Sequence, residues 1–314
     1  MLELSGKLGK YEIIRKLGSG GFGTVYLARD EYLDVLRALK TPHRNAAQLE
    51  KMVEEGRVQT RLLDHPNIVK LLTVESIDGI FIMVMEYVEG TDLEKIIDKQ
   101  DTLDVSAALH YLRQILSALE FAHRHKVIHR DIRPSNILIG HENQVKITDF
   151  GTSTLLDARP FATTRIGSPP YMAPEQFEGH AVYASDIYSA GCLFYEMVTG
   201  FPPIVLANPM EIYQKAKAGS YPSLASKNHQ ISAELNQVIM KALAPSPRDR
   251  YPSAADFLAD LDRQENKSRN IHQEMLDIHR RIQARENRVD HVCWNCHKAL
   301  VRKTAHCPYC GEEQ

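Results

Sequence analysis

The stretch 127–151 constrains the fold of this chain more than any other segment. Within it, Asn136 follows Asp131 by five residues, and Asp149 comes thirteen residues after Asn136. Two short runs in this stretch have the composition of strands, namely 136–139 and 145–147. The residues that join the two runs, 140–143, are typical of a turn. The pattern predicts a β-hairpin whose open end brings Asp131, Asn136 and Asp149 together.

Two carboxylates and one amide in such a group suit the transfer of a phosphoryl group. One carboxylate accepts the proton of the attacking hydroxyl, while a second carboxylate and an amide oxygen hold Mg²⁺ against the phosphates. The segment 129–136, HRDIRPSN, and the tripeptide DFG at 149–151 together resemble the catalytic and DFG loops of protein kinases. The resemblance implies that Asp131 is the catalytic base and that Asn136 and Asp149 are magnesium ligands.

A glycine-rich segment, 18–23, lies between two segments with strand composition, 11–17 and 24–28. Glycines let the backbone of a turn approach phosphate oxygens closely. A dinucleotide-binding fold would place a helix after such a motif, whereas β-branched and aromatic residues follow here. The order strand, turn, strand resembles the glycine-rich loop of protein kinases, and the resemblance places Val25 on the adenine.

A third predicted strand, 35–40, ends in Ala38-Leu39-Lys40. Taken alone, Lys40 is better interpreted as a surface lysine. The glycine-rich loop at the usual distance upstream reverses that interpretation, because the tripeptide then resembles the kinase strand whose lysine binds the α- and β-phosphates.

In protein kinases a glutamate on the next helix pairs with this lysine, and here a helix is predicted over 46–63. Counting back from His65 without a gap places Gly56 at the glutamate position, directly after Glu55. One residue of slip rotates a side chain by about 100° on a helix. Either the following loop is one residue longer and Glu55 makes the pair, or the pair is absent or comes from elsewhere; we favour Glu55.

The apolar run 81–85 is typical of a buried strand, and its continuation resembles the kinase hinge. By that resemblance Met85 is the gatekeeper, and the backbone of 86–88 binds the adenine. Asp92 stands where the family places an acidic residue on the ribose, and it also fits a helix N-cap, so the two roles are compatible. The implied nucleotide site comprises Leu17, Gly18, Gly20, Gly21, Gly23, Val25, Ala38, Lys40, Glu55, Met85, Glu86, Val88, Asp92, Leu138 and Asp149.

The implied catalytic set is Lys40, Asp131, Arg133 and Asn136, and Arg133 departs from the family. A lysine usually stands there and contacts the transferred phosphate. Arginine keeps the charge and offers a wider fork, so we expect it to be tolerated, although the two side chains are not interchangeable. Pro134 and the segment 167–175 resemble the Ser/Thr branch of the family rather than the tyrosine branch.

Further markers of the family follow in order. Residues 173–175, APE, resemble the end of an activation segment, Asp186 resembles the residue that braces the catalytic loop, and 247–251 resembles the segment whose arginine pairs with Glu175. The match covers 11–263.

The polar segment before residue 173 contains two candidate regulatory sites. We predict that Thr163 or Thr164 is an activating phosphosite, because Arg130 beside the catalytic aspartate could pair with a phosphate there. If neither threonine is modified in the active protein, both are ordinary loop residues.

The composition excludes several other classes of protein. The 314 residues suffice for one large or two medium domains, and the content of 43% hydrophobic and 25% charged residues is ordinary for a globular protein. A net charge of −2 creates no global field toward nucleic acid or membrane. There is no apolar run of membrane-spanning length and no signal-peptide core at the N-terminus. We therefore predict a cytoplasmic location.

Four of the five cysteines lie in the last 22 residues as two CxxC pairs, Cys293 with Cys296 and Cys307 with Cys310. Such paired knuckles place four thiolates within reach of one Zn²⁺, which resembles a small zinc ribbon over 291–314. We favour a structural metal and a reducing compartment over disulfides. A segment this short cannot bury a core unaided, so the metal would supply its folding energy.

The segment 264–290 is polar and charged, with apolar residues at helical spacing, namely Ile271, Met275, Ile278, Ile282 and Val289. It predicts an amphipathic helix that packs on the kinase body or pairs with a copy of itself as a homodimer. This helix and the zinc ribbon are candidate contacts for a protein partner. Residues 264–314 hold nine Lys and Arg against seven Asp and Glu, too even a balance for nucleic-acid binding.

The predicted fold class is α+β, a bilobal protein-kinase fold with a β-rich N-lobe and a helical C-lobe, followed by a helix and a zinc ribbon. The predicted boundaries are a tail at 1–10, the kinase domain at 11–263 with lobes at about 11–85 and 89–263, a helical linker at 264–290 and the ribbon at 291–314.

The predicted function is ATP-dependent phosphorylation of protein Ser/Thr hydroxyls, with ATP, Mg²⁺ and structural Zn²⁺ as cofactors and regulation through the activation segment and the zinc module. The alternative is a catalytically weak, pseudokinase-like scaffold. The departures at Gly56 and Arg133 favour the alternative, and the retained base and metal residues oppose it.

Overall fold

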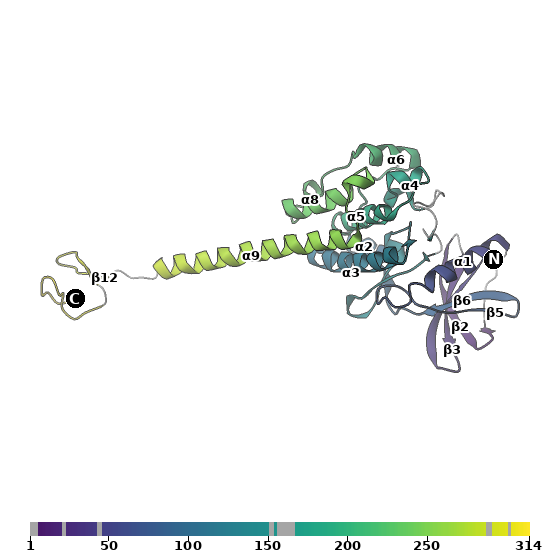
Figure 1. Ribbon diagram of the computed structural model, residues 1–314. Helices are drawn as coiled ribbons and strands as arrows, with labels where there is room; N and C mark the ends of the chain where they lie inside the picture. The colour runs from purple at the N-terminus through teal and green to yellow at the C-terminus, as the bar shows by residue number, and fades with distance from the viewer. Residues whose placement is uncertain are drawn as a thin grey trace. The chain divides into compact units, whose positions relative to one another are not determined.

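Alternating strands and tight turns near the N-terminus build one antiparallel sheet in the order β1-β2-β3-β4-β6-β5 (Figure 1). Its strands are β1 (Gly6–Leu8), β2 (Tyr11–Gly20), β3 (Gly23–Asp30), β4 (Val35–Thr41), β5 (Leu71–Ile77) and β6 (Ile80–Glu86). Strand β1 comes from the predicted tail and pairs with β2, Leu8 opposite Tyr11. The computed structural model describes residues 6–20, 23–42, 46–150, 154–155, 167–286, 291–300 and 303–314.

Helix α1 (Ala46–Gln59) packs against β5 and β6 and completes the N-terminal lobe. It is shorter than the predicted helix 46–63. After Gln59 the chain tightens into a turn in which the Leu62 amide donates to the Gln59 carbonyl, three residues back rather than four. The apolar residues behind this turn, Val58 and Leu62, are buried in the core of the neighbouring lobe.

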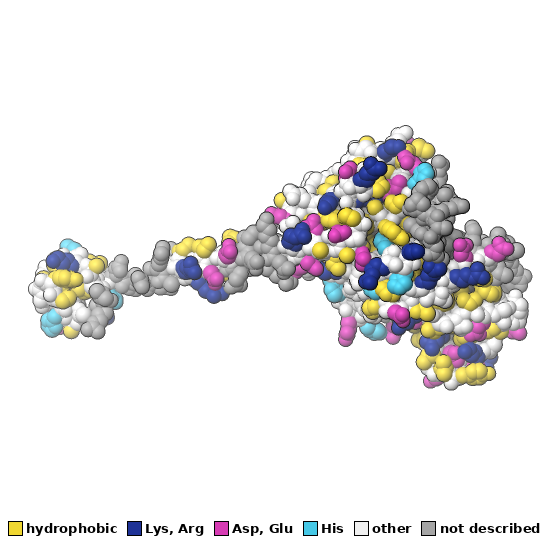
Figure 2. All heavy atoms as spheres, in the orientation of Figure 1, with side chains coloured by type: hydrophobic (Ala, Val, Ile, Leu, Met, Phe, Trp, Pro, Cys, Tyr) yellow, Lys and Arg dark blue, Asp and Glu magenta, His cyan; other side chains and the backbone are white. Residues whose placement is uncertain are grey.

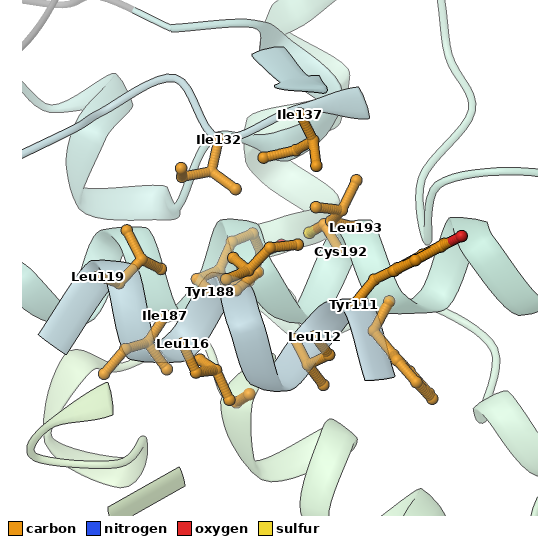
Figure 3. Packing of buried hydrophobic residues seen from close by; sticks show 14 of the residues in the cluster. Tyr111, Leu112, Leu116, Leu119, Ile132, Ile137, Ile187, Tyr188, Cys192 and Leu193 are labelled. Carbon is orange, nitrogen blue, oxygen red and sulfur yellow. The ribbon is translucent and has the colours of Figure 1, made fainter. Parts of the chain in front are cut away.

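The C-terminal lobe is helical and is organised around α3 and α5. Its helices are α2 (Leu93–Gln100), α3 (Val105–Arg124), α4 (Pro174–Phe177), α5 (Tyr183–Thr199), α6 (Pro209–Ala218), α7 (Leu224–Lys227) and α8 (Ala233–Ala242). Figure 3 shows Leu112, Leu116 and Leu119 of α3 packed with Ile187 and Tyr188 of α5. Most residues of α5 are buried, as expected for a largely apolar helix.

The predicted hairpin of the catalytic stretch is present beside this core. Strands β9 (Ile137–Ile139) and β10 (Val145–Ile147) pair antiparallel, and β7 (Thr91–Asp92) pairs with the other edge of β9. The pair β8 (Val127–Ile128) and β11 (Thr154–Leu155) lies next to the loop that carries the catalytic motif. Short 3₁₀ turns complete the lobe, namely η1 (Pro134–Asn136), η2 (His141–Asn143), η4 (Pro169–Tyr171) and η5 (Pro247–Asp249).

The chain divides into two compact units, Met1–Leu261 and Asp262–Gln314. Helix α9 (Ala254–Glu286) begins in the first unit and continues without a break into the second. The second unit ends in a small hairpin, β12 (His291–Val292) with β13 (Ala299–Leu300), followed by a bridge between His306 and Glu313. Among the described helices, none combines the length and the apolar character that a bilayer crossing needs.

Candidate functional site

The loop between β8 and η1 places Asp131 beside Asn136. The Asn136 side-chain amide donates to the Asp131 carbonyl at 2.8 Å and to its carboxylate Oδ2 at 3.2 Å. Because these bonds occupy the amide nitrogen, the amide oxygen is the atom of Asn136 that remains suited to a metal. The turn η1 therefore sets the relation between the predicted base and one predicted metal ligand.

Asp186 on α5 forms hydrogen bonds with the backbone of this loop. Its carboxylate accepts bonds from the amides of His129 and Arg130 at 2.9 and 2.8 Å, and it lies 2.8 Å from His123 Nε2. Burial alone would raise the pKa of Asp186, but its bonds to His123 and the loop amides keep that pKa below its ordinary value. Arg130 has a left-handed φ of 69°, which is an unfavourable conformation for a residue with a side chain. The hydrogen bond from its amide to Asp186 stabilises this conformation.

Lys40 joins the two lobes through two carboxylates. Its Nζ lies 2.7 Å from Glu55 Oε1 and 3.0 Å from Asp149 Oδ1, and the lysine is only 6% exposed. Burial alone would lower the pKa of Lys40, but the charges of Glu55 and Asp149 raise it above its ordinary value. Lys40 is thus held as a cation at the place where the strand β4, the helix α1 and the DFG motif meet.

Glu55 makes the ion pair with Lys40, whereas Gly56 faces the strand β5. A Cβ on Gly56 would lie 3.3 Å from Val74 Cγ2 and 3.7 Å from Leu71 Cδ2, so this face of α1 packs on β5. The face that carries Glu55 is turned by one residue and meets Lys40 instead. Glycine at 56 allows α1 to lie close to the sheet.

The apolar residues predicted to surround the adenine belong to one cluster. The cluster combines the two lobes and contains Leu17, Val25, Ala38, Met85, Val88 and Leu138. Ala38 and Met85 are opposite each other on β4 and β6, while Leu138 lies on β9 of the other lobe. The structure therefore brings these predicted residues together around one apolar site.

The described glycines of the predicted glycine-rich segment lie at the adjoining ends of β2 and β3, with Gly18 opposite Val25 and Gly20 opposite Gly23. Gly23 needs to be glycine, because its φ is 153° and a Cβ would lie 2.1 Å from the carbonyl oxygen of Thr41. A Cβ on Gly18 would meet no atom of the described residues within 4 Å. Gly21 lies outside the described residues, as do Thr163 and Thr164.

Two acidic residues of the predicted nucleotide site have protein partners for their side chains. The Glu86 carboxylate lies 2.7 Å from Lys146 Nζ and accepts the Lys70 amide, so only the Glu86 backbone suits an adenine contact. Asp92 caps α2 by accepting the Lys95 amide at 2.9 Å and pairs with the Lys95 ammonium. The N-cap interpretation of Asp92 is confirmed, and a ribose contact stays a prediction.

Sequence reasoning missed a network of polar groups next to Asp131. Ser168 Oγ donates to Asp131 Oδ1 at 2.8 Å, and Arg133 Nη1 donates to Ser168 Oγ at 3.0 Å. The other terminal nitrogen of Arg133 lies 3.2 Å from a carboxylate oxygen of Glu94 on α2. Since Glu94 is 39 residues away from Arg133, no local pattern could have indicated this pair.

Glu196 on α5 was also missed, although the sequence holds a signal for it. Asp186 and Glu196 are the acidic residues of this largely apolar helix, which marks both as unusual. Glu196 accepts a bond from the Tyr171 hydroxyl at 2.7 Å, and burial raises its pKa to about 7. The bond fixes Tyr171, which is in the turn that follows Ser168.

The predicted ion pair at the end of the activation segment involves Arg250. Its guanidinium lies 2.6 and 2.9 Å from the two oxygens of Glu175, on the short helix α4. The Ser185 hydroxyl donates to the same carboxylate at 2.6 Å, so the buried charges are hydrogen bonded as well as paired.

The four C-terminal cysteines form a separate cluster. Their Sγ atoms all lie within 4.8 Å of one another; those of Cys293 and Cys310 are 3.5 Å apart, and those of Cys296 and Cys307 are 3.6 Å apart. A disulfide would need about 2.05 Å. Four sulfur ligands around zinc, each at about 2.3 Å, would be separated by about 3.8 Å. The donor set and its spacing therefore fit one tetrahedral zinc ion.

Comparison with known proteins agrees with this geometry. A model of the protein kinase domain family matches residues 11–261. The chain is 36% identical over 259 residues to the serine/threonine-protein kinase PrkC of Bacillus subtilis, which covers 81% of this chain and 40% of that protein. It is 34% identical over 270 residues to the serine/threonine-protein kinase PknB of Mycobacterium tuberculosis, which covers 82% of this chain and 43% of that one.

The chain belongs to the protein kinase family. PknB of Mycolicibacterium smegmatis gives a similar result, at 36% identity over 268 residues. The chain spans about two fifths of the length of these relatives, and their similarity covers about four fifths of the chain. The fold of the first unit, with its curled sheet and helical lobe, is that of a protein kinase.

Proposed function

We propose that this chain is an ATP-dependent protein kinase that phosphorylates serine or threonine hydroxyls of other proteins. The observation that carries the proposal is the position of Lys40, which binds both Glu55 of α1 and Asp149 of the DFG motif. Such a bridge needs the sheet lobe, α1 and the DFG motif in one arrangement, which is the arrangement that phosphoryl transfer in this family requires. The names of the relatives support the Ser/Thr class.

The residues divide the work of transfer among them. Asp131 accepts the proton of the substrate hydroxyl, and Asn136 holds Asp131 in place through its amide. Lys40 binds the α- and β-phosphates, while Arg133 contacts the phosphate that moves. Bound Mg²⁺ neutralises charge on the phosphates, and the oxygens of Asn136 and Asp149 would hold it. The apolar cluster around Val25 and Met85 would enclose the adenine and exclude water.

The alternative of a catalytically weak, pseudokinase-like scaffold loses support from the surroundings of Gly56 and Arg133. The pair with Lys40 is present despite Gly56, because Glu55 makes it. Arg133 keeps a cation beside Ser168 and Asp131. Neither departure removes a group that the reaction needs.

The C-terminal unit would bind one structural Zn²⁺ through Cys293, Cys296, Cys307 and Cys310. All four ligand positions would be sulfur, which leaves no position for a reacting water, so we expect no catalysis there. We propose 291–314 as a zinc ribbon and 264–290 as the linker that precedes it, whose described part belongs to α9 and ends at Glu286.

The same unit offers surface for a protein partner or a second copy of the chain. Met275, Ile278 and Ile282 on α9 are exposed, and so are Trp294 and Tyr309 of the ribbon. Figure 2 shows hydrophobic side chains gathered along one side of α9. Exposed apolar side chains at helical spacing favour contact with another protein. The cytoplasmic location and the phosphosite at Thr163 or Thr164 stay predictions.

The proposal is tested by incubating the purified chain with labelled ATP, Mg²⁺ and a generic basic protein. Transfer of label to serine or threonine of that protein supports the proposal, and Asp149→Ala should abolish the transfer. A wild-type chain that binds ATP but transfers no phosphate under any Mg²⁺ concentration would instead support the scaffold.

A further inference from the structure

The guanidinium of Arg133 has two partners, each bound by a different terminal nitrogen. A lysine at this position would offer only one charged nitrogen. Nη1 donates to Ser168 Oγ at 3.0 Å, and Nη2 lies 3.2 Å from Glu94 Oε1. The third nitrogen, Nε, is buried and has no partner in the part of the chain that the structure describes. These two bonds use two of the five N–H donors of the guanidinium and give it a defined plane, while the Nε donor is left over.

We propose that Glu94 is a positioning residue for phosphoryl transfer, which holds the guanidinium of Arg133 in the orientation that meets the transferred phosphate. The inference rests on the proposed kinase function. It explains how this chain works with arginine where the family usually has lysine. The ammonium of a lysine needs only to be near the phosphate, whereas the planar guanidinium of an arginine must also be correctly oriented.

Glu94 is placed on a rigid support. It lies in the first turn of α2, whose N-terminus is capped by Asp92 and whose Leu93 and Ile97 are buried in the lobe. The helix also contacts η1, the turn that follows Arg133. A carboxylate in the first turn of a helix is favoured by the helix dipole. A side chain on such a support can hold its partner more accurately than one on a loop.

The surrounding charges agree with an orienting role. Arg133 lowers the pKa of Glu196 while Glu94 raises it, so the three side chains lie within range of one another's charge. Through Ser168, the same guanidinium is connected to the carboxylate of Asp131. Without Glu94, the guanidinium of Arg133 would keep its hydrogen bond to Ser168 and could rotate toward Glu196.

The pair should contribute little to the stability of the fold. The side chains of Arg133 and Glu94 are 33% and 47% exposed, and exposed ion pairs are weak. A purely structural role and an orienting role therefore predict different results. The structural role would change the unfolding temperature, and the orienting role would change kcat.

The test compares Glu94→Gln in two backgrounds, the natural chain and Arg133→Lys. In the natural chain we expect Glu94→Gln to lower kcat about 5- to 20-fold, with the KM values for ATP and for protein substrate within twofold and an unchanged unfolding temperature. In the Arg133→Lys background the same change should alter kcat less than twofold, because an ammonium needs no orientation. Glu94→Asp should recover part of the loss.

A matched control is Glu89→Gln, which removes an exposed carboxylate that faces His141 rather than Arg133, and it should leave kcat unchanged. Equal losses in both backgrounds, or a loss confined to the KM of the protein substrate, would overturn the positioning role. So would a kcat for Glu94→Gln within twofold of the natural chain. If the natural chain transfers no phosphate at all, the proposed function itself fails and this inference falls with it.

Discussion

The first unit buries a large set of apolar side chains around α3 and α5, whereas the apolar cluster among the described residues of the C-terminal unit consists of Leu300 and three cysteines. In the first unit the polar site rests on a core that is already stable. Asp186, for example, is fully buried in α5 and braces the catalytic loop from the core side. In the second unit the groups that would bind the ligand are themselves the core.

The two units should therefore respond differently to substitutions in their sites. A polar side chain of the kinase site can be changed without opening the core, so activity and stability should separate. In the cysteine cluster they should not separate, since binding of the metal and folding are the same event in a metal-dependent module. Four predictions test this contrast, from the largest expected effect to the smallest.

Loss of a cysteine ligand should unfold the C-terminal module. Structural zinc supplies roughly 10–16 kcal/mol of apparent folding free energy in small zinc modules. We expect Cys293→Ser to reduce bound zinc from about one ion per chain to almost none and to remove the protection of amides in 291–314 from hydrogen exchange. ATP binding by the first unit should persist. Elemental analysis and hydrogen exchange measure the two effects.

His306→Ala is the control for this change, because it alters a nearby histidine that the all-cysteine site does not need. It should retain zinc. Zinc retained by Cys293→Ser together with zinc lost from His306→Ala would show that the ligand set is wrong.

Changing the proposed base or metal ligand should abolish activity and spare the fold. We expect Asp131→Ala and Asp149→Asn each to lower phosphoryl transfer by at least about a hundredfold, because each removes a charge that acts in the transition state. Asparagine also tolerates the left-handed φ of 63° at position 149. Labelled-phosphate transfer and the unfolding temperature are measured side by side.

Asp78→Asn serves as the control, since Asp78 is an aspartate with φ of 49° in the β5–β6 turn. It should keep full activity. Undiminished transfer in both site variants would contradict the kinase proposal, and a collapse of the fold in both would contradict the separation of activity from stability.

Glu55→Gln should lower activity about tenfold or more, while Glu54→Gln should have little effect. Glu55 is buried against Lys40, and removing one charge of a buried pair leaves the other uncompensated. Glu54 is exposed on the same helix. The kcat and KM for ATP of the two variants measure the difference, and similar values for both would mean that this ion pair is not needed for transfer.

The smallest effect concerns the pH dependence of stability. Burial raises the pKa of Glu196 to about 7, from about 4.5 in the unfolded chain. The folded state therefore binds more protons between these values, so this residue costs stability progressively as the pH rises from 4.5 to 7. We expect Glu196→Gln to remove this cost and to raise the free energy of unfolding by roughly 1–3 kcal/mol at about pH 8.

At about pH 4 the same substitution should change stability little, because the natural carboxyl is then largely protonated in both states. Urea unfolding at the two pH values measures the difference. A gain of equal size at both values would show that the charge of Glu196 is not responsible.

Much of the chemistry of the site is local in the sequence. The intervals between Asp131, Asn136 and Asp149 predict that these residues lie at the open end of a hairpin, because a two-stranded hairpin allows few other arrangements, and β9 and β10 form that hairpin. The two CxxC pairs predict the cysteine cluster for the same reason. Spacing within a tight turn limits where a side chain can be, so these features follow from the order of the amino acids alone.

Other features depend on contacts between distant elements, and only the tertiary structure decided them. The helix α1 turns Glu55 rather than Gly56 toward Lys40 because Gly56 packs on Val74 of β5. Arg133 finds Glu94 because α2 packs against the turn η1. A pattern along one helix or strand carries no information on the angle at which it meets its neighbour, and that angle is set by how side chains fit together in the core.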